Sequence, residues 1–171
     1  AHGWMANRLG DSTAKYSGRL TLNPLAHIDI FGTILLPLML FISTNGAFVF
    51  GAAKPVPINL SALRNPKRDI IWIGASGPLA NLAFAFILAL ILKIIPGPGL
   101  ILVLLKNLLM INVVLGVFNL IPLPPLDGSR ILMGLLPKNL AYGYSRIEPF
   151  GFIVIILLLS LGYIDFLIWP P

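Results

Sequence analysis

Long runs of apolar residues constrain this chain more than any other feature of its sequence. Residues 70–92 and 100–121 are predominantly apolar, and each is as long as the ~20 residues that a helix needs to cross a bilayer. A third run, residues 149–169, ends at Trp169, a residue type that anchors helices at the membrane surface. With 57% hydrophobic and 11% charged residues, the chain is too apolar for a soluble domain. The runs predict an all-α polytopic membrane protein with about three full transmembrane helices.

A fourth apolar run, residues 32–51, is interrupted where a crossing helix would be continuous. Pro37 lies inside it, and the Ser-Thr-Asn-Gly sequence at residues 43–46 is typical of a turn. We therefore predict a re-entrant hairpin. If this run folds back, most basic residues share one face, which the positive-inside rule makes cytoplasmic. These residues are Arg8, Lys15, Arg19, Lys54, Arg64, Lys67, Arg68, Arg130, Lys138 and Arg146.

Two short stretches between the apolar runs have extended character. Residues 17–23 alternate polar and apolar side chains, which predicts a short strand. Residues 54–59 contain two prolines, and the residue before each proline is pushed out of the helical region. Between these stretches, His27 and Asp29 either orient a ligand or cap a turn at the membrane surface. We expect both stretches to form short membrane-associated strands.

Composition limits the chemistry that this chain can use. It has no cysteine, so any metal must be bound by His, Asp or Glu. Its net charge of +6 comes mainly from connections between apolar runs. This distribution is expected of cytoplasmic loops, and it does not indicate a nucleic-acid partner.

The run at residues 100–121 ends in a proline-rich break that carries one acid. Pro122, Pro124 and Pro125 remove backbone donors and end the helix, and Asp127 follows them. An acid at membrane depth is costly and normally has a partner, such as a metal, a base or a proton path. The alternative is an ordinary solvated acid at a helix end. His2, at the other end of the chain, is the candidate partner.

Three short elements of the sequence occur together, in this order, in one known family. Residues 1–11 look like the end of a His-Glu-x-x-His helix, with His2 as the second histidine. Residues 77–81 read Gly-Pro-Leu-Ala-Asn, and residues 119–128 contain Asn-x-x-Pro and end in Leu-Asp-Gly. The chain therefore resembles the site-2 proteases, which are intramembrane zinc metalloproteases. Residues 18–29 and 54–59 resemble a compact bacterial branch of that family, so we expect one membrane-embedded domain over residues 1–171.

The resemblance implies zinc as the cofactor and a role for four side chains. His2 would be the second histidine ligand and Asp127 the carboxylate ligand, and a further position would be open for water. Asn81 and Asn119 would hold the substrate backbone or an oxyanion, or form hydrogen bonds between helices. In the family pattern, the first histidine and the general-base glutamate lie four and three positions before the second histidine. Both would fall ahead of Ala1, so we expect no catalytic residue in this chain and no activity of the chain alone.

The resemblance also implies a location and a substrate class. We expect a multi-pass protein of the cell membrane, in contact with the lipid bilayer, with the active site toward the cytoplasmic face. His2 and Asp127 must then lie at the same depth. Expected substrates are transmembrane proteins or signal-peptide remnants, which would add a strand to the extended stretches. The alternatives are a small transporter or channel, in which Asp127 and Lys106 line a polar pathway, and a non-catalytic membrane partner.

Overall fold

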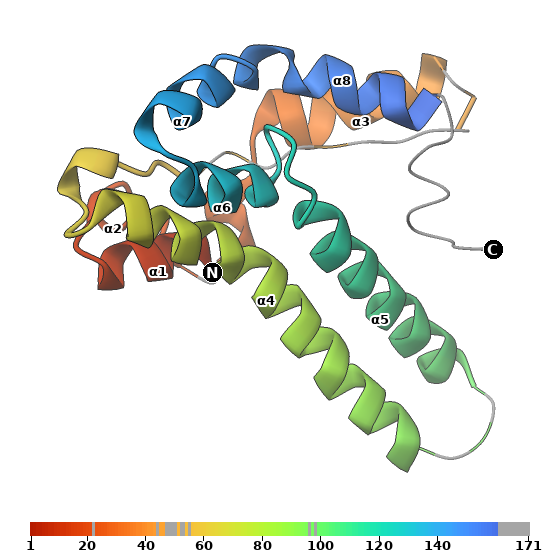
Figure 1. The fold of residues 1–171 in the computed structure, drawn as a ribbon. Helices are drawn as coiled ribbons and strands as arrows, with labels where there is room; N and C mark the ends of the chain where they lie inside the picture. The colour runs from red at the N-terminus through yellow and green to blue at the C-terminus, as the bar shows by residue number, and fades with distance from the viewer. Residues whose placement is uncertain are drawn as a thin grey trace.

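All regular elements in the described part of the chain are helical (Figure 1). The computed structural model describes residues 1–21, 23–43, 45–46, 51, 54, 56–95, 97 and 99–160. Its α-helices are α1 (His2–Arg8), α2 (Thr13–Tyr16), α3 (Leu36–Ser43), α4 (Pro66–Ile94), α5 (Leu100–Asn119), α6 (Asp127–Leu135), α7 (Lys138–Ser145) and α8 (Glu148–Ser160). Two 3-10 segments, η1 (Pro24–His27) and η3 (Leu60–Ala62), and a π-helical segment, η2 (Ile30–Leu35), lie between them. The predicted all-α class is confirmed for these residues.

Helices α4 and α5 form an antiparallel pair (Figure 1) and are the two described helices that are long and apolar enough to cross a membrane. Only 17% and 6% of their most apolar 18-residue windows are buried. The core helix of a soluble protein is mostly buried, whereas a helix in lipid exposes its apolar side chains. The runs predicted at residues 70–92 and 100–121 are therefore confirmed as long apolar helices.

Glycines allow α5 and α6 to approach α4 closely. A Cβ atom on Gly116 of α5 would lie 2.9 Å from the side chain of Leu82 in α4. A Cβ atom on Gly134 of α6 would lie 2.7 Å from the carbonyl oxygen of Lys67. Small residues permit such approaches between helices in membranes. Because α6 packs on the first half of α4, the chain beyond α5 returns to the N-terminal part of α4.

The N-terminal helices pack against the same part of α4. Ala6, Leu63 and Ile73 form a buried cluster there, against which Met5, Leu9 and Ile58 pack. The backbone N–H of Arg64 donates to the carbonyl of Leu9 at 3.2 Å, which attaches the segment before α4 to the end of α1. Helix α1 is thereby held alongside α4.

Asp11 connects the turn between α1 and α2 to the extended stretch before η3. Its side chain is fully buried, and its carboxylate accepts hydrogen bonds from the backbone N–H of Asn59 at 2.7 Å and of Thr13 at 2.9 Å. Burial alone would raise the pKa of this carboxyl. The hydrogen bonds from Thr13 and Asn59 outweigh it, and the pKa of Asp11 lies below its usual value.

The predicted strand at residues 17–23 is wrong, since the described part of the chain contains no strand. Residues 17–21 form a turn and a bend, and the side chain of Asn23 accepts a hydrogen bond from Leu25 N–H and begins η1. No strand lies beside this stretch in the described part of the chain, so it cannot form the hydrogen bonds of a sheet. The Asn23 side chain instead forms a local hydrogen bond with the backbone. Residues 56–59 are irregular rather than a strand, although Asn59 has extended angles, with φ −101° and ψ 101°.

The segment predicted as a re-entrant hairpin begins with η2 and α3. Asp29 accepts a hydrogen bond from Gly32 N–H and caps η2, as one of the two sequence interpretations expected. The chain then comes back, because a Cβ atom on Gly51 would lie 2.9 Å from the Pro37 ring and 3.3 Å from the carbonyl oxygen of Gly32. Of the turn predicted at residues 43–46, Asn45 and Gly46 have φ of 51° and 78°, and the backbone N–H of Gly46 donates to the carbonyl of Phe41 at 2.8 Å. Residues 44 and 47–50 lie outside the described residues.

Helices α7 and α8 follow α6 and cover the proline-rich break. The Tyr144 hydroxyl donates to the carbonyl of Pro122 at 2.8 Å, and Gly151 of α8 lies directly against the carbonyl of Pro124. Figure 1 shows α8 running in a different direction from α4 and α5. The final span predicted at residues 149–169 is helical to Ser160, and its remainder lies outside the described residues.

Candidate metal centre

The structure brings together two side chains from opposite ends of the chain. His2 Nε2 lies 3.3 Å from Asp127 Oδ2. The two side chains are 28% and 18% exposed, so both are partly buried. They come from the first residues of α1 and α6, and both helices pack on α4.

The orientation of the His2 ring is set by α4. His2 Nδ1 lies 2.8 Å from the carbonyl oxygen of Ile73. A carbonyl oxygen can only accept, so Nδ1 donates in this contact, and Nε2 is the nitrogen that faces Asp127. Ser76 donates to the same carbonyl at 2.7 Å and lies 3.4 Å from Nδ1. A histidine held in this way through its other nitrogen is typical of a metal ligand.

Asp127 is positioned by the start of α6. It is in the first turn of that helix, where the backbone dipole stabilises a negative charge. A Cβ atom on the next residue, Gly128, would lie 2.2 Å from the Leu120 carbonyl oxygen and 2.4 Å from that of Ile121. No side chain fits there. The Asp-Gly sequence therefore lets the break fold back over the start of α6 and turn the carboxylate toward α4.

Gly77 forms the floor of the site. A Cβ atom at this position would lie 2.4 Å from His2 Nε2 and 2.8 Å from Asp127 Oδ2. These two atoms are the ones that could bind a metal ion, and they have room because Gly77 has no side chain. The Gly-Pro-x-x-Asn element thus has a direct steric reason for its glycine, which sequence inspection alone did not provide.

The two asparagines lie nearby but are placed differently. Asn81 follows Gly77 by four residues and is therefore on the same face of α4. Asn119, at the end of α5, donates from Nδ2 to the carbonyl of Leu115 in its own helix at 2.9 Å. This bond is not the interhelical one that the alternative interpretation expected. Neither amide contacts His2 or Asp127 in the hydrogen bonds of the described residues.

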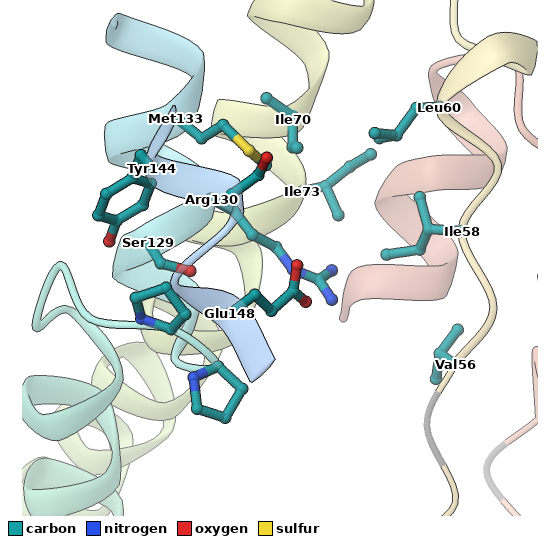
Figure 2. A pocket seen from close by; sticks show the side chains of 13 residues that line it. Val56, Ile58, Leu60, Ile70, Ile73, Ser129, Arg130, Met133, Tyr144 and Glu148 are labelled. Atoms are coloured by element: carbon teal, nitrogen blue, oxygen red, sulfur yellow. The ribbon is translucent and has the colours of Figure 1, made fainter. Parts of the chain in front are cut away.

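A cavity of about 190 Å³ lies against α4 and α6, although neither His2 nor Asp127 lines it. It shares Ile73 with the site, and its wall includes Ser129 and Arg130, which follow Asp127 in α6. Figure 2 shows Val56, Ile58 and Leu60 along one side of the cavity, facing side chains of α4 and α6, with Arg130 and Glu148 between them. Sequence analysis missed this wall, although the period of two in Val56, Ile58 and Leu60 is the signal of an extended segment with one apolar face.

The donor set fits part of a zinc site. An imidazole nitrogen and a carboxylate oxygen 3.3 Å apart can bind one ion, and both are common zinc ligands. Within the described residues, no group of three His, Cys, Asp or Glu side chains could hold a metal ion. His27 is not near the pair, since its Nε2 bonds the carbonyl oxygen of Thr21 at 3.1 Å. The described site thus offers two ligands.

Comparison with known proteins agrees with this geometry. Residues 96–161 match the model of "Peptidase family M50". The chain is 36% identical to "Putative zinc metalloprotease YwhC" of Bacillus subtilis, over 99% of this chain and 78% of that protein. It is 38% identical to "Zinc metalloprotease MJ0392" of Methanocaldococcus jannaschii over 47% of this chain and 23% of that protein. It is 28% identical to "Putative zinc metalloprotease Rip2" of Mycolicibacterium smegmatis, over 92% of this chain and 60% of that protein.

No solved structure matches the chain significantly. Two lines of comparison nevertheless agree, because the family model and the full-length similarity to YwhC both point to one group of peptidases. The sequence resemblance to site-2 proteases is thereby confirmed. The chain belongs to peptidase family M50.

Proposed function

We propose that this chain is the membrane-embedded domain of a zinc metalloprotease that hydrolyses peptide bonds of transmembrane segments. The contact between His2 Nε2 and Asp127 Oδ2 at 3.3 Å is the observation that carries the proposal. The family membership and the names of its relatives support a peptidase over a transporter, a channel or a non-catalytic partner.

His2 and Asp127 are the proposed zinc ligands of this chain. Ile73 and Ser76 hold the imidazole so that Nε2 remains free to bind, and Gly77 keeps the space between the two donors open. Bound zinc lowers the pKa of a coordinated water to about 7 and polarises the scissile carbonyl. The partial exposure of both ligands lets water reach them, which hydrolysis requires.

Zinc content tests the ligand assignment directly. The protein, expressed from its natural gene, should hold about one zinc per chain, as measured by atomic emission. His2→Gln and Asp127→Asn should each lower zinc affinity at least tenfold. Even the loss of a group that only hydrogen-bonds a metal ligand typically costs about 10–100-fold in affinity. His27→Gln is the matched control, because it removes the other histidine of the chain, whose Nε2 bonds the Thr21 carbonyl and not the pair. Equal zinc loss in the control would contradict the assignment.

The proposed substrate is a locally unwound membrane segment that lies along residues 56–60. The side chains of Val56 and Ile58 both line the cavity, so in an extended stretch the backbone groups of these alternate residues face one common edge. Pro57 has no N–H and faces the other edge, which therefore pairs poorly. A substrate strand would add beside Val56 and Ile58, and Asn81 and Asn119 would hold its backbone near the zinc ligands.

Ile58→Pro tests this substrate mode. It removes a donor from the proposed pairing edge and should lower cleavage of a membrane-anchored reporter, while zinc content stays at the wild-type level. Ile58→Val keeps the donor and is the control. Unchanged cleavage by a folded Ile58→Pro variant would refute strand addition at this stretch.

The proposed topology is multi-pass, with residues 32–51 as a re-entrant hairpin and the metal site toward the cytoplasm. The return of Gly51 to Gly32 and Pro37 supports the hairpin. Gly77 follows Arg68 by nine residues, which is about 14 Å along α4, so the site would lie well inside the bilayer and receive water through the cavity.

The chain has no cysteine, which makes the topology test simple. Single cysteines at Lys15 and Lys93 should react with an impermeant thiol reagent from opposite sides of the membrane. Labelling of both from one side would overturn the topology.

A further inference from the structure

A second hollow, distinct from the cavity beside the metal site, lies where the end of α1 meets the start of α4. Its volume is about 220 Å³, several times the ~30 Å³ that a water molecule occupies in the liquid. Arg8 of α1, Arg64 of the preceding connection and Arg68 of α4 line it, together with Leu9, Asn65, Asp69 and Trp72. Three cations from three segments thus converge on one space.

These arginines have no acidic partner within the described residues. The ion pair recorded there joins His2 and Asp127, so no carboxylate oxygen lies within 4.0 Å of Arg8, Arg64 or Arg68. The acid in the wall, Asp69, is only 4% exposed, and its carboxylate accepts the backbone N–H of Asn65 at 2.8 Å. It is used to start α4 and forms no ion pair with the three arginines.

Two of these arginines are attached to neighbouring groups, Arg64 through its backbone and Arg8 through its side chain. The backbone N–H of Arg64 donates to the carbonyl of Leu9 at 3.2 Å. The guanidinium carbon of Arg8 lies 4.4 Å from the centre of the Trp4 ring, a cation–π contact that orients its side chain. A guanidinium presents several donors in a fixed plane, which suits the oxygens of a phosphate.

The position of the hollow indicates where such a phosphate would come from. Trp72 lies one turn beyond Arg68 on α4 and is 47% exposed, and Trp4 is 49% exposed. Tryptophans and arginines at the start of an apolar helix mark the membrane–water interface, where lipid headgroups lie. Figure 1 shows α1, α2 and the start of α4 gathered at one end of the molecule.

We propose that this hollow binds the phosphate of an anionic phospholipid headgroup. The inference does not depend on the metal site, because none of the residues that line the hollow contacts His2 or Asp127. The acyl chains would extend along the exposed apolar face of α4 beyond Trp72. The lipid would thereby join α1, which carries His2, to α4 at the membrane surface.

Native mass spectrometry of the detergent-solubilised protein tests the proposal. We expect one phosphatidylglycerol per chain to be retained in preference to phosphatidylcholine. Arg64→Gln combined with Arg68→Gln should weaken that binding about 30-fold, from the typical contribution of two basic residues at a membrane surface. Lys15→Gln combined with Lys67→Gln is the matched control, which removes the same charge nearby but outside the hollow, and it should bind within a few-fold of wild type.

Three results would overturn the proposal. Equal weakening in the control would show diffuse surface charge rather than a site. Full displacement of the lipid by soluble glycerol 3-phosphate would assign the hollow to a free phosphate. A wild-type protein with no preference for phosphatidylglycerol would refute the proposal even if the arginine variant failed to fold. The double variant Arg64→Lys and Arg68→Lys keeps both charges and should therefore preserve lipid binding.

Discussion

Replacement of Gly77 by alanine tests the geometry of the metal centre most directly. The added Cβ atom would lie 2.4 Å from His2 Nε2, 2.5 Å from His2 Cε1 and 2.8 Å from Asp127 Oδ2. All three distances are shorter than carbon atoms tolerate, so the imidazole or α6 must move. Metal ligands tolerate shifts of only about 0.2 Å. We therefore expect Gly77→Ala to weaken zinc binding by at least tenfold.

The effect of this substitution on stability should be much smaller than its effect on zinc. Alanine is favoured over glycine inside a helix by about 1 kcal/mol, whereas overpacking costs about 1–3 kcal/mol. The net change in the free energy of unfolding should thus fall between about 0 and 2 kcal/mol. Loss of zinc from a protein that still melts near the wild-type temperature is the expected signature.

Gly143→Ala is the matched control for this experiment. It also lies in a helix, α7, but a Cβ atom there would meet nothing within 4 Å. It should bind zinc normally and gain about 1 kcal/mol from helix propensity. If Gly77→Ala retained wild-type zinc affinity, the placement of His2 and Asp127 against α4 would be refuted.

Three further substitutions test the framework around the site. Asp11→Asn should cost about 1–3 kcal/mol, because the charged acceptor of the Asn59 and Thr13 bonds is lost. Since the folded pKa of Asp11 lies below its ordinary 3.8, its contribution should be present above pH 3.8 and vanish as the pH falls through the folded pKa, so wild type and Asp11→Asn should converge in acid melts. Gly128→Ala should prevent α6 from docking and abolish zinc binding, as the contacts at 2.2 and 2.4 Å are to backbone. Tyr144→Phe should lower the melting temperature by the equivalent of about 1 kcal/mol, for its lost bond to Pro122.

The membrane helices could be predicted from the sequence because their signal is local. A helix that spans lipid needs about 20 predominantly apolar residues in a row, and α4 and α5 each contain such a run. The predicted strand at residues 17–23 failed for the opposite reason. Alternation over a few residues does not reveal whether a partner strand exists, and the side chain of Asn23 offers a competing hydrogen bond.

The site was only partly accessible to sequence reasoning. The pairing of His2 with Asp127 came from a family resemblance, and their role as ligands stays a prediction. The expectation that the chain alone is inactive likewise stays a prediction. No pattern in the sequence pointed to the Ile73 carbonyl that orients His2, because every residue carries a carbonyl. The period of two at Val56, Ile58 and Leu60 indicates an extended segment with one apolar face. It does not reveal that this face lines a cavity together with residues of α6.

The two proposed ligands come from opposite ends of the fold, and this has a consequence for biosynthesis. A ribosome produces the imidazole early and the carboxylate only after both long helices have been made. Until α6 has docked against α4, a nascent chain lacks the carboxylate of this pair and cannot retain the metal through it. Hydrolytic competence would thus be acquired last, once the domain is assembled, which protects newly inserted membrane segments from a half-built protease.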